Sequence, residues 1–238
     1  MKYLVTGFVI LLTVAGLQAQ VKVNDANAQV RKVGSFHSIK VSHAIDLVLS
    51  QSDVEALAVS AAKDEYRDRI KTTVDNGVLK IWYDEEEKWY RNRGNKKLKA
   101  YVSFKTLNKL NASGASDVTV TGSITANKLV MEFSGASDFR GAIQVESLEV
   151  QLSGASDAVV SGSAANTKVD ASGASHLKAF DLKVEVCNAE ASGASDIWIT
   201  INKELNANAS GASSIQYRGE GVVRNLKTGG ASSISRKG

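Results

Sequence analysis

This chain of 238 residues has almost none of two residue types, cysteine, which cross-links folds, and proline, which interrupts backbone hydrogen bonding. Proline is absent, and cysteine occurs once, as Cys187. A single cysteine excludes an intrachain disulfide framework, so stability has to come from packing and backbone hydrogen bonds. Proline is the residue that lacks a backbone N–H. Because the chain has none, every residue can donate to a β-ladder, and long uninterrupted ladders are compatible with the sequence.

The chain also lacks a strong charge of one sign. It has 29 Lys and Arg against 25 Asp and Glu, a formal net charge of +4. Residues 88–109 are the exception, with eight Lys or Arg and no acid, directly after the acids at 84–87. We expect a solvated loop there, and contact of this basic block with a polyanion or glycan is the alternative. We expect no nucleic-acid partner, because acids adjoin the one basic block and the start of the chain predicts export.

Aromatic residues make up only 6% of the chain. Those that fall outside the alternating apolar pattern are candidates for contact with a partner. Exposed aromatic rings stack on sugars and on protein partners, although a lone outward tryptophan also occurs without a function. The candidate partner contacts are Trp89, Tyr90, Arg91, Arg93 and Trp198.

A long apolar run occurs only near the start, over residues 3–17, after Lys2 and before the small residue Ala19. This layout predicts a signal peptide over residues 1–19. We therefore expect export to the periplasm, the outer surface or the medium. The run is at the short end for a membrane helix and nothing comparable follows, so we expect no membrane span in the mature chain.

The tetrapeptide Ser-Gly-Ala-Ser occurs six times, and a variant Gly-Gly-Ala-Ser starts at Gly229. The copies begin at Ser113, Ser134, Ser153, Ser172, Ser192 and Ser210. Successive copies lie 21, 19, 19, 20, 18 and 19 residues apart. Units this small cannot bury an apolar face without neighbours, so the repeat predicts a stacked solenoid.

Apolar residues alternate with polar ones on both sides of each motif. Counting the first motif residue as position zero, position minus two is polar in every unit and position five is apolar in every unit. A period of two indicates strands with one face in a core. We predict an all-β fold, a parallel β-helix of about seven coils over residues 111–238, with right-handed coils as the expectation.

Residues 20–110 are β-rich without the motif and are expected to pack with the repeats as one domain. Asn76-Gly77 between two alternating runs predicts a hairpin. A short helix is expected within residues 61–70 and a strand over residues 99–104. This segment is expected to cover the first coil, because the end of an uncapped stack exposes unpaired backbone.

An N-terminal pattern of Phe36, Ile39 and Val41, the Asn76-Gly77 hairpin and the repeated Ser-Gly-Ala-Ser-Asp together resemble the "putative autotransporter adhesin, head GIN domain" family. The resemblance covers the chain from about Arg31 to the end. It implies a β-helical surface or secreted protein with an adhesive role and without catalytic residues.

Position four of each unit is the best place for chemistry. The column consists of Asp117, Asp138, Asp157, His176, Asp196, Ser214 and Ser233. Stacked carboxylates raise one another's pKa or recruit a cation, so Asp117, Asp138 and Asp157 are candidate Ca²⁺ ligands, or acid and base groups of a polysaccharide lyase or hydrolase. The structural alternative is hydrogen bonding to nearby amides and hydroxyls. Replacement by Ser and His within the column favours that alternative.

The remaining candidates have simple structural interpretations. Cys187 has the inward parity and is expected to be a small buried residue. His37 and His43 lie six residues apart without Cys or clustered acids, which favours exposed or capping roles over metal binding.

Three functions follow from these observations. The first is a non-enzymatic adhesin or envelope binding module for a glycan or protein partner, and we expect no catalytic residues and no cofactor. The second is a polysaccharide-active or Ca²⁺-binding protein that uses the aspartate column. The third is a purely structural periplasmic protein. The end of the stack shows no evident cap, so a homo-oligomer is also possible.

Overall fold

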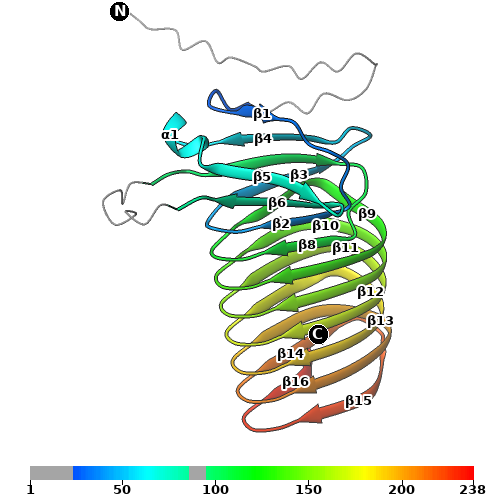
Figure 1. Ribbon diagram of the computed structural model, residues 1–238. Helices are drawn as coiled ribbons and strands as arrows, with labels where there is room; N and C mark the ends of the chain where they lie inside the picture. Colours follow the sequence, from blue (N-terminus) through cyan, green and yellow to red (C-terminus); the bar gives the residue numbers. More distant parts are fainter. Residues whose placement is uncertain (1–23, 86–94) are drawn as a thin grey trace, which may run out of the picture.

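The chain forms a β-solenoid in the computed structural model, which describes residues 24–85 and 95–238 (Figure 1). Five long strands build the middle of the stack: β9 (Val118–Phe133), β10 (Phe139–Leu152), β11 (Asp157–Ala171), β12 (His176–Ala191) and β13 (Asp196–Ala209). The far end comprises β14 (Ser214–Arg218), β15 (Val222–Thr228) and β16 (Ser233–Arg236). The predicted all-β solenoid of about seven coils is confirmed.

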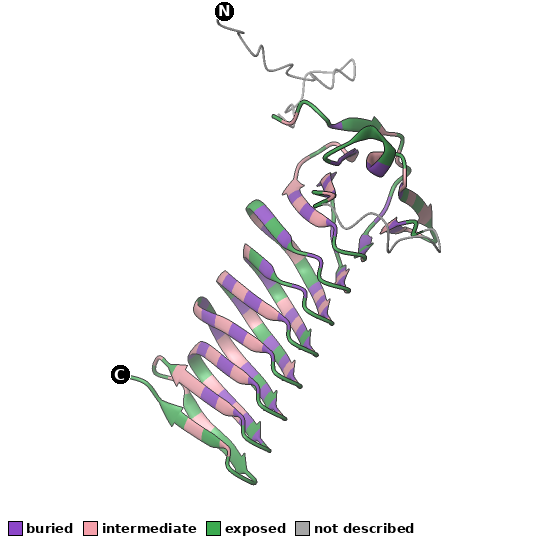
Figure 2. Ribbon diagram, turned by 90° about the vertical axis from the view of Figure 1, so that its left-hand side faces the viewer, coloured by how far each residue is buried: buried purple, intermediate pink, exposed green. Residues whose placement is uncertain are grey.

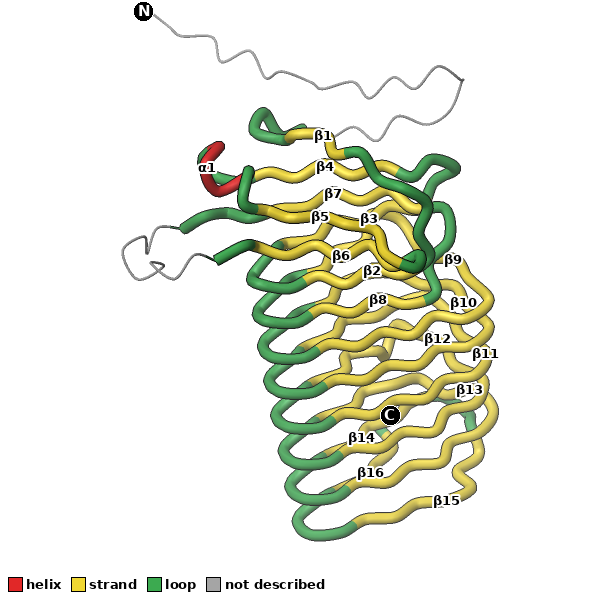
Figure 3. The backbone as a smooth tube through the Cα atoms, in the orientation of Figure 1, coloured by secondary structure: helices red, strands yellow, loops and turns green. Residues whose placement is uncertain are grey.

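Neighbouring coils pair in parallel, so equivalent residues of successive units lie side by side. Position five forms one inward column of Val118, Phe139, Ala158, Leu177, Ile197, Ile215 and Ile234. Each long strand bends midway and returns to the next corner, so a coil has one run after its corner and one before the next (Figure 3). Unequal unit lengths are absorbed at this bend, for example by the register shift between Ala179 and Lys183.

A single apolar core runs through the stack, because the inward residues of both runs meet inside each coil. Buried and more exposed residues alternate along the strands as bands (Figure 2). Cys187 is fully buried in this core, as its parity predicts. The buried polar residues of the middle coils are mainly serines of the corners.

Glycine is required at the second motif position by both its dihedral angle and its surroundings. Gly173 has φ +75°, a left-handed conformation that is costly for other residues. A Cβ atom there would lie 2.5 Å from the carbonyl oxygen of Gly154 on the preceding coil. The Ala174 amide donates to the same carbonyl at 2.7 Å, so the close approach is itself a hydrogen-bonded contact.

The fourth motif residue is a buried serine that closes the corner. The Ser175 hydroxyl donates to the Ser172 carbonyl at 2.9 Å, and Ser195 does the same to Ser192 at 2.8 Å. The hydroxyl also accepts from the preceding coil, since the Ser116 amide donates to Ser137 Oγ at 3.2 Å. Serine recurs because it satisfies buried backbone groups that alanine would leave unpaired.

The solenoid continues into the N-terminal segment through a corner that lacks the motif. Strand β2 (Ser38–Val41) pairs in parallel with β8 (Lys109–Ala112), and β3 (Asp46–Gln51) pairs with β9. Between β2 and β3 the chain turns at His43 and Ala44, which have φ of +66° and +55°. The Ala44 amide donates to the Gly114 carbonyl at 3.0 Å. These contacts make Ser42-His43-Ala44 a further corner of the same stack.

The N-terminal end of the stack is closed by strands that pair beyond this corner. Strand β7 (Lys99–Phe104) pairs in parallel with β3, β4 (Ala56–Ser60) pairs antiparallel with β7, and β1 (Gln29–Arg31) pairs antiparallel with β4. On the other run, β6 (Val78–Tyr83) pairs with β2, and β5 (Ile70–Asp75) forms the predicted hairpin with β6. The strand over residues 99–104 and the short helix, α1 (Asp64–Arg67), are confirmed. The segment covers the first coil as expected.

At the opposite end, β15 and β16 form the last coil and expose Val222 and Leu226. No helix within residues 24–85 or 95–238 is long and apolar enough to cross a membrane.

Candidate binding face

The outward side chains of the runs that follow the corners form one surface, which we call the post-corner face. Its members on β10 to β14 include Arg140, Asp157, Val159, His176, Lys178, Phe180, Asp196, Trp198, Gln216 and Arg218. They alternate with buried residues such as Leu177 and Ala179. The fold needs the inward residues for packing, whereas these positions are free to differ from coil to coil.

The column at position four is assembled as predicted, because Asp157, His176, Asp196, Ser214 and Ser233 are register partners on successive strands. It is joined internally by hydrogen bonds. His176 Nδ1 lies 2.8 Å from Asp157 Oδ1, and its Nε2 lies 3.6 Å from Asp196 Oδ2. The Ser214 hydroxyl donates to Asp196 Oδ1 at 2.5 Å. The imidazole therefore bridges two carboxylates that belong to different coils.

The carboxylates of the column differ in their electrostatic surroundings. Burial raises the pKa of Asp117 above its usual value, and the neighbouring charge of Asp138 adds to the increase. Burial alone would also raise the pKa of Asp157, but hydrogen bonds from His176 and Lys178 outweigh it and lower that pKa. Lys178 Nζ lies 3.0 Å from Asp157 Oδ2. At one end of the column the carboxylates of Asp117 and Asp138 repel each other and Asp46 adds to the repulsion, whereas in the middle His176 and Lys178 compensate Asp157.

The column does not show a metal cage. In the described parts of the chain, no three His, Cys, Asp or Glu side chains are grouped so that they could hold a metal ion. Ca²⁺ binding by Asp117, Asp138 and Asp157 stays a prediction.

An aromatic pair lies next to the column. The rings of Phe180 and Trp198 are stacked, with centroids 6.0 Å apart and an interplanar angle of 10°. The Arg218 guanidinium carbon lies 4.1 Å from the centroid of Phe180. Both rings are half-buried, and Arg218 is exposed. Near-parallel rings and an adjacent guanidinium are a favourable arrangement in water and also a surface on which a flat ligand can stack.

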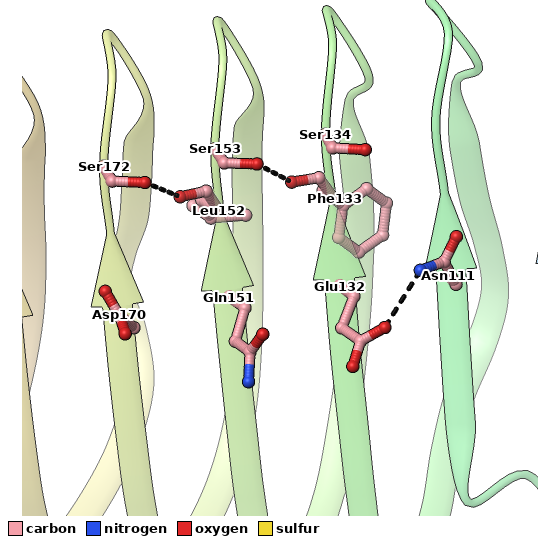
Figure 4. Close-up of a pocket in the computed structure, with 9 residues that line it drawn as sticks. All are labelled: Asn111, Glu132, Phe133, Ser134, Gln151, Leu152, Ser153, Asp170 and Ser172. Carbon is pink, nitrogen blue, oxygen red and sulfur yellow. Dashed lines mark hydrogen bonds between the residues drawn. The ribbon is translucent and has the colours of Figure 1, made fainter.

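The opposite, pre-corner surface is polar and only shallowly hollowed. One hollow of about 300 Å³ lies beside the corners, where Asn111 donates to Glu132 and Ser153 donates to the Phe133 carbonyl (Figure 4). A second hollow, of about 530 Å³, lies nearer the far end. An asparagine ladder crosses it, from Asn225 to Asn206 at 2.8 Å and from Asn206 to Asn188 at 3.1 Å.

The geometry above agrees with a known protein family. Residues 35–221 match the family described as "Putative auto-transporter adhesin, head GIN domain". The chain belongs to this family. No curated protein matches the sequence.

Solved structures share the GIN-domain fold. A "putative adhesin" from Bacteroides fragilis is 24% identical with a TM-score of 0.82, over 88% of this chain and 96% of that chain. A "putative adhesin" from Parabacteroides merdae has a TM-score of 0.70 at 17% identity, over 89% and 95% of the two chains. A "putative lipid binding protein" from Parabacteroides distasonis has a TM-score of 0.68 at 21% identity, over 89% and 97%. At these identities the likeness shows the fold alone.

The candidate residues have different outcomes in this GIN domain. The structure places Trp198 outward on β13, whereas Trp89, Tyr90, Arg91 and Arg93 lie outside the described residues. His37 and His43 lie at opposite ends of β2 and do not meet; they contact Ser38 and Ser42 respectively.

Sequence reasoning missed Phe180 and Arg218 as neighbours of Trp198. Phe180 is eight positions past its motif start and Trp198 is six past the next, so simple counting places them in different columns. The only sequence signal was that large aromatic residues occupy outward positions in two consecutive units.

Proposed function

We propose that this GIN-domain chain is exported and acts without catalysis, as a binding module that presents its outer solenoid surface to a glycan or protein partner. The supporting observation is that some positions of the repeat hold the same type of residue in every coil, whereas others differ from coil to coil. Inward position five is apolar in every coil, whereas outward position six holds, in order, Thr119, Arg140, Val159, Lys178, Trp198, Gln216 and Ser235. A regular scaffold with a chemically varied face is suited to recognition.

The state of the aspartate column favours binding over hydrolysis. A catalytic acid or base has to be available to a substrate. Asp157 is instead engaged by His176 and Lys178, and Asp196 accepts from Ser214. These bonds hold adjacent coils together and leave the pair Asp117 and Asp138 as the less engaged part of the column.

Export belongs to the proposal as well. It is supported by the signal-like residues 1–19 and by the adhesin description of the family. The location is then the periplasm, the outer surface or the medium, and the exposed edge at β15 and β16 makes self-association a further part of the proposal.

Binding of the purified chain tests this function. We expect the chain expressed with residues 1–19 to be cleaved after Ala19. Intact-mass spectrometry of the exported protein measures this. The mature chain should bind members of a glycan array or immobilised envelope proteins. It should leave acidic polysaccharides uncut, with or without Ca²⁺. Turnover that Asp138→Ala and Asp157→Ala abolish would contradict the proposal and favour a polysaccharide-active enzyme.

A further inference from the structure

We call Phe180, Trp198 and Arg218 the aromatic patch, and their side chains lie outside the apolar core of the solenoid. The inward neighbours Ala179, Ile197 and Ile199 fill the core at these points. Phe180 and Trp198 face away from it, where other coils carry small or polar residues such as Thr119 and Ser161. Two large aromatic side chains side by side on an outer surface are a candidate contact surface for a partner.

The stacking of the two rings leaves part of each ring uncovered by the other. Close contact between carbon atoms needs about 3.5–4.0 Å, whereas the centroids lie 6.0 Å apart at an interplanar angle of 10°. The rings are therefore offset, and each covers only part of its neighbour. The Trp198 Nε1 donor is shielded from solvent and has no hydrogen-bond acceptor in the described structure.

The charges around the patch indicate the kind of ligand. Lys178 is paired with Asp157, and Asp196 accepts from Ser214, so these groups are already compensated. Arg218 has no carboxylate within ion-pair distance among the described residues and lies over the Phe180 ring. A guanidinium in this state recognises a carboxylate by paired hydrogen bonds.

We propose that the aromatic patch binds an acidic pyranoside, a uronic or sialic acid unit of a glycan, with the sugar ring against the exposed part of the Phe180–Trp198 stack and the sugar carboxylate on Arg218. Apolar C–H faces of a pyranose match the flat aromatic surface. Lys178 and Gln216 are the register partners of Trp198 on the two neighbouring strands, so polar side chains flank the indole on both sides. Such side chains can hydrogen-bond sugar hydroxyls. This inference rests on the proposed binding function and specifies its site and ligand class.

Array binding with matched variants tests the site. The probes are uronic- and sialic-acid glycans, each paired with its methyl ester, which keeps the ring and removes the charge. We expect the wild-type chain to prefer the acids. Trp198→Ala, Phe180→Ala and Arg218→Gln should each weaken binding by about tenfold or more. Trp82→Ala is the control, because Trp82 is a half-buried outward tryptophan of the β6 hairpin, remote from the patch.

Fluorescence gives a second readout that does not depend on truncating the patch. The chain has three tryptophans, so Trp82→Phe with Trp89→Phe leaves Trp198 as the only one. Titration with trigalacturonate should shift its emission, and the methyl ester should shift it far less. This double variant keeps every residue of the patch.

The outcomes separate the site from the general function. Binding of acids that is unchanged in all three patch variants, or a preference for the esters, overturns the site and leaves the binding function standing. Binding to proteins only overturns the acidic-glycan ligand and leaves the function standing. No binding to any glycan or protein overturns both.

Discussion

Single atoms decide which residue is tolerated at a corner. Gly154, Gly173, Gly193 and Gly211 all have φ near +74°, and a Cβ atom at each would meet the backbone of the preceding coil. Gly122 has a similar φ of +81° but open space around it. This contrast separates the dihedral cost of a side chain from its steric cost.

Gly173→Ala is therefore expected to destabilise the chain by about 2–4 kcal/mol, from the left-handed dihedral and from displacement of the Gly154 carbonyl. Gly122→Ala carries the dihedral cost alone, about 1 kcal/mol. Urea unfolding followed by circular dichroism measures both. Equal losses at the two sites would contradict close stacking of the corners.

Ser175→Ala removes the donor to the Ser172 carbonyl and leaves that buried corner under-bonded. We expect a loss of about 1–2 kcal/mol in the free energy of unfolding. Ser163→Ala, at an exposed serine of β11, is the control and should change stability by less than about 0.5 kcal/mol. A neutral Ser175→Ala variant would show that the hydroxyl is dispensable.

Cys187 provides a residue-scale probe of the core. Burial raises the pKa of its thiol to about 12, and the side chain is fully enclosed between coils. The thiol should react with a disulfide reagent only after unfolding, at a rate set by opening of the stack. Rapid reaction in native buffer at pH 8 would contradict the placement of β12.

At the scale of the element, the column at position four shows how one sequence pattern has two electrostatic outcomes. Asp117 has a raised pKa and so costs stability when ionised, whereas Asp157 has a lowered pKa and contributes stability when ionised. The difference comes from the neighbours, since Asp117 stacks near Asp138 and Asp157 stacks next to His176.

Asp157→Asn should lower the free energy of unfolding at pH 7, and Asp117→Asn should raise it. Each change is a few tenths of a kcal/mol, about the size of a solvent-screened pair. The contribution of Asp157 is present above its unfolded pKa of about 3.9 and is lost as pH falls through the lower folded pKa. The cost of ionised Asp117 likewise disappears on acidification. Thermal unfolding from pH 7 to pH 3 checks this, and changes of the same sign in both variants would contradict it.

Elements with strong local signals were predictable from sequence. Asn76-Gly77 identified the β5–β6 hairpin, and the period of the motif identified the register of β9 to β13. The corner at Ser42-His43-Ala44 was not found, because it adopts left-handed angles without glycine and is recognised only by its pairing with Gly114. The contact of Phe180 with Trp198 was missed because the two are diagonal neighbours: Trp198 is in register with Lys178, and Phe180 lies two residues further along β12.

At the scale of the whole molecule, all of these features depend on one geometric fact, the parallel and in-register stacking of coils. Because of this stacking, equivalent residues of successive units lie side by side in columns. The inward columns form the core, the motif residues form the corners, and the outward columns form the varied outer face. Adjacent strands in a sheet lie about 4.8 Å apart. Residues of neighbouring coils are thus within disulfide range, and residues two coils apart are not.

Disulfide trapping along position six tests this stacking most directly. Arg140 is the register partner of Thr119 on one side and of Val159 on the other. In a Cys187→Ala background, Thr119→Cys with Arg140→Cys should form an intramolecular disulfide on mild oxidation, and Thr119→Cys with Val159→Cys should not. Efficient cross-linking of the second pair, or failure of the first in a folded protein, would contradict the stacked solenoid.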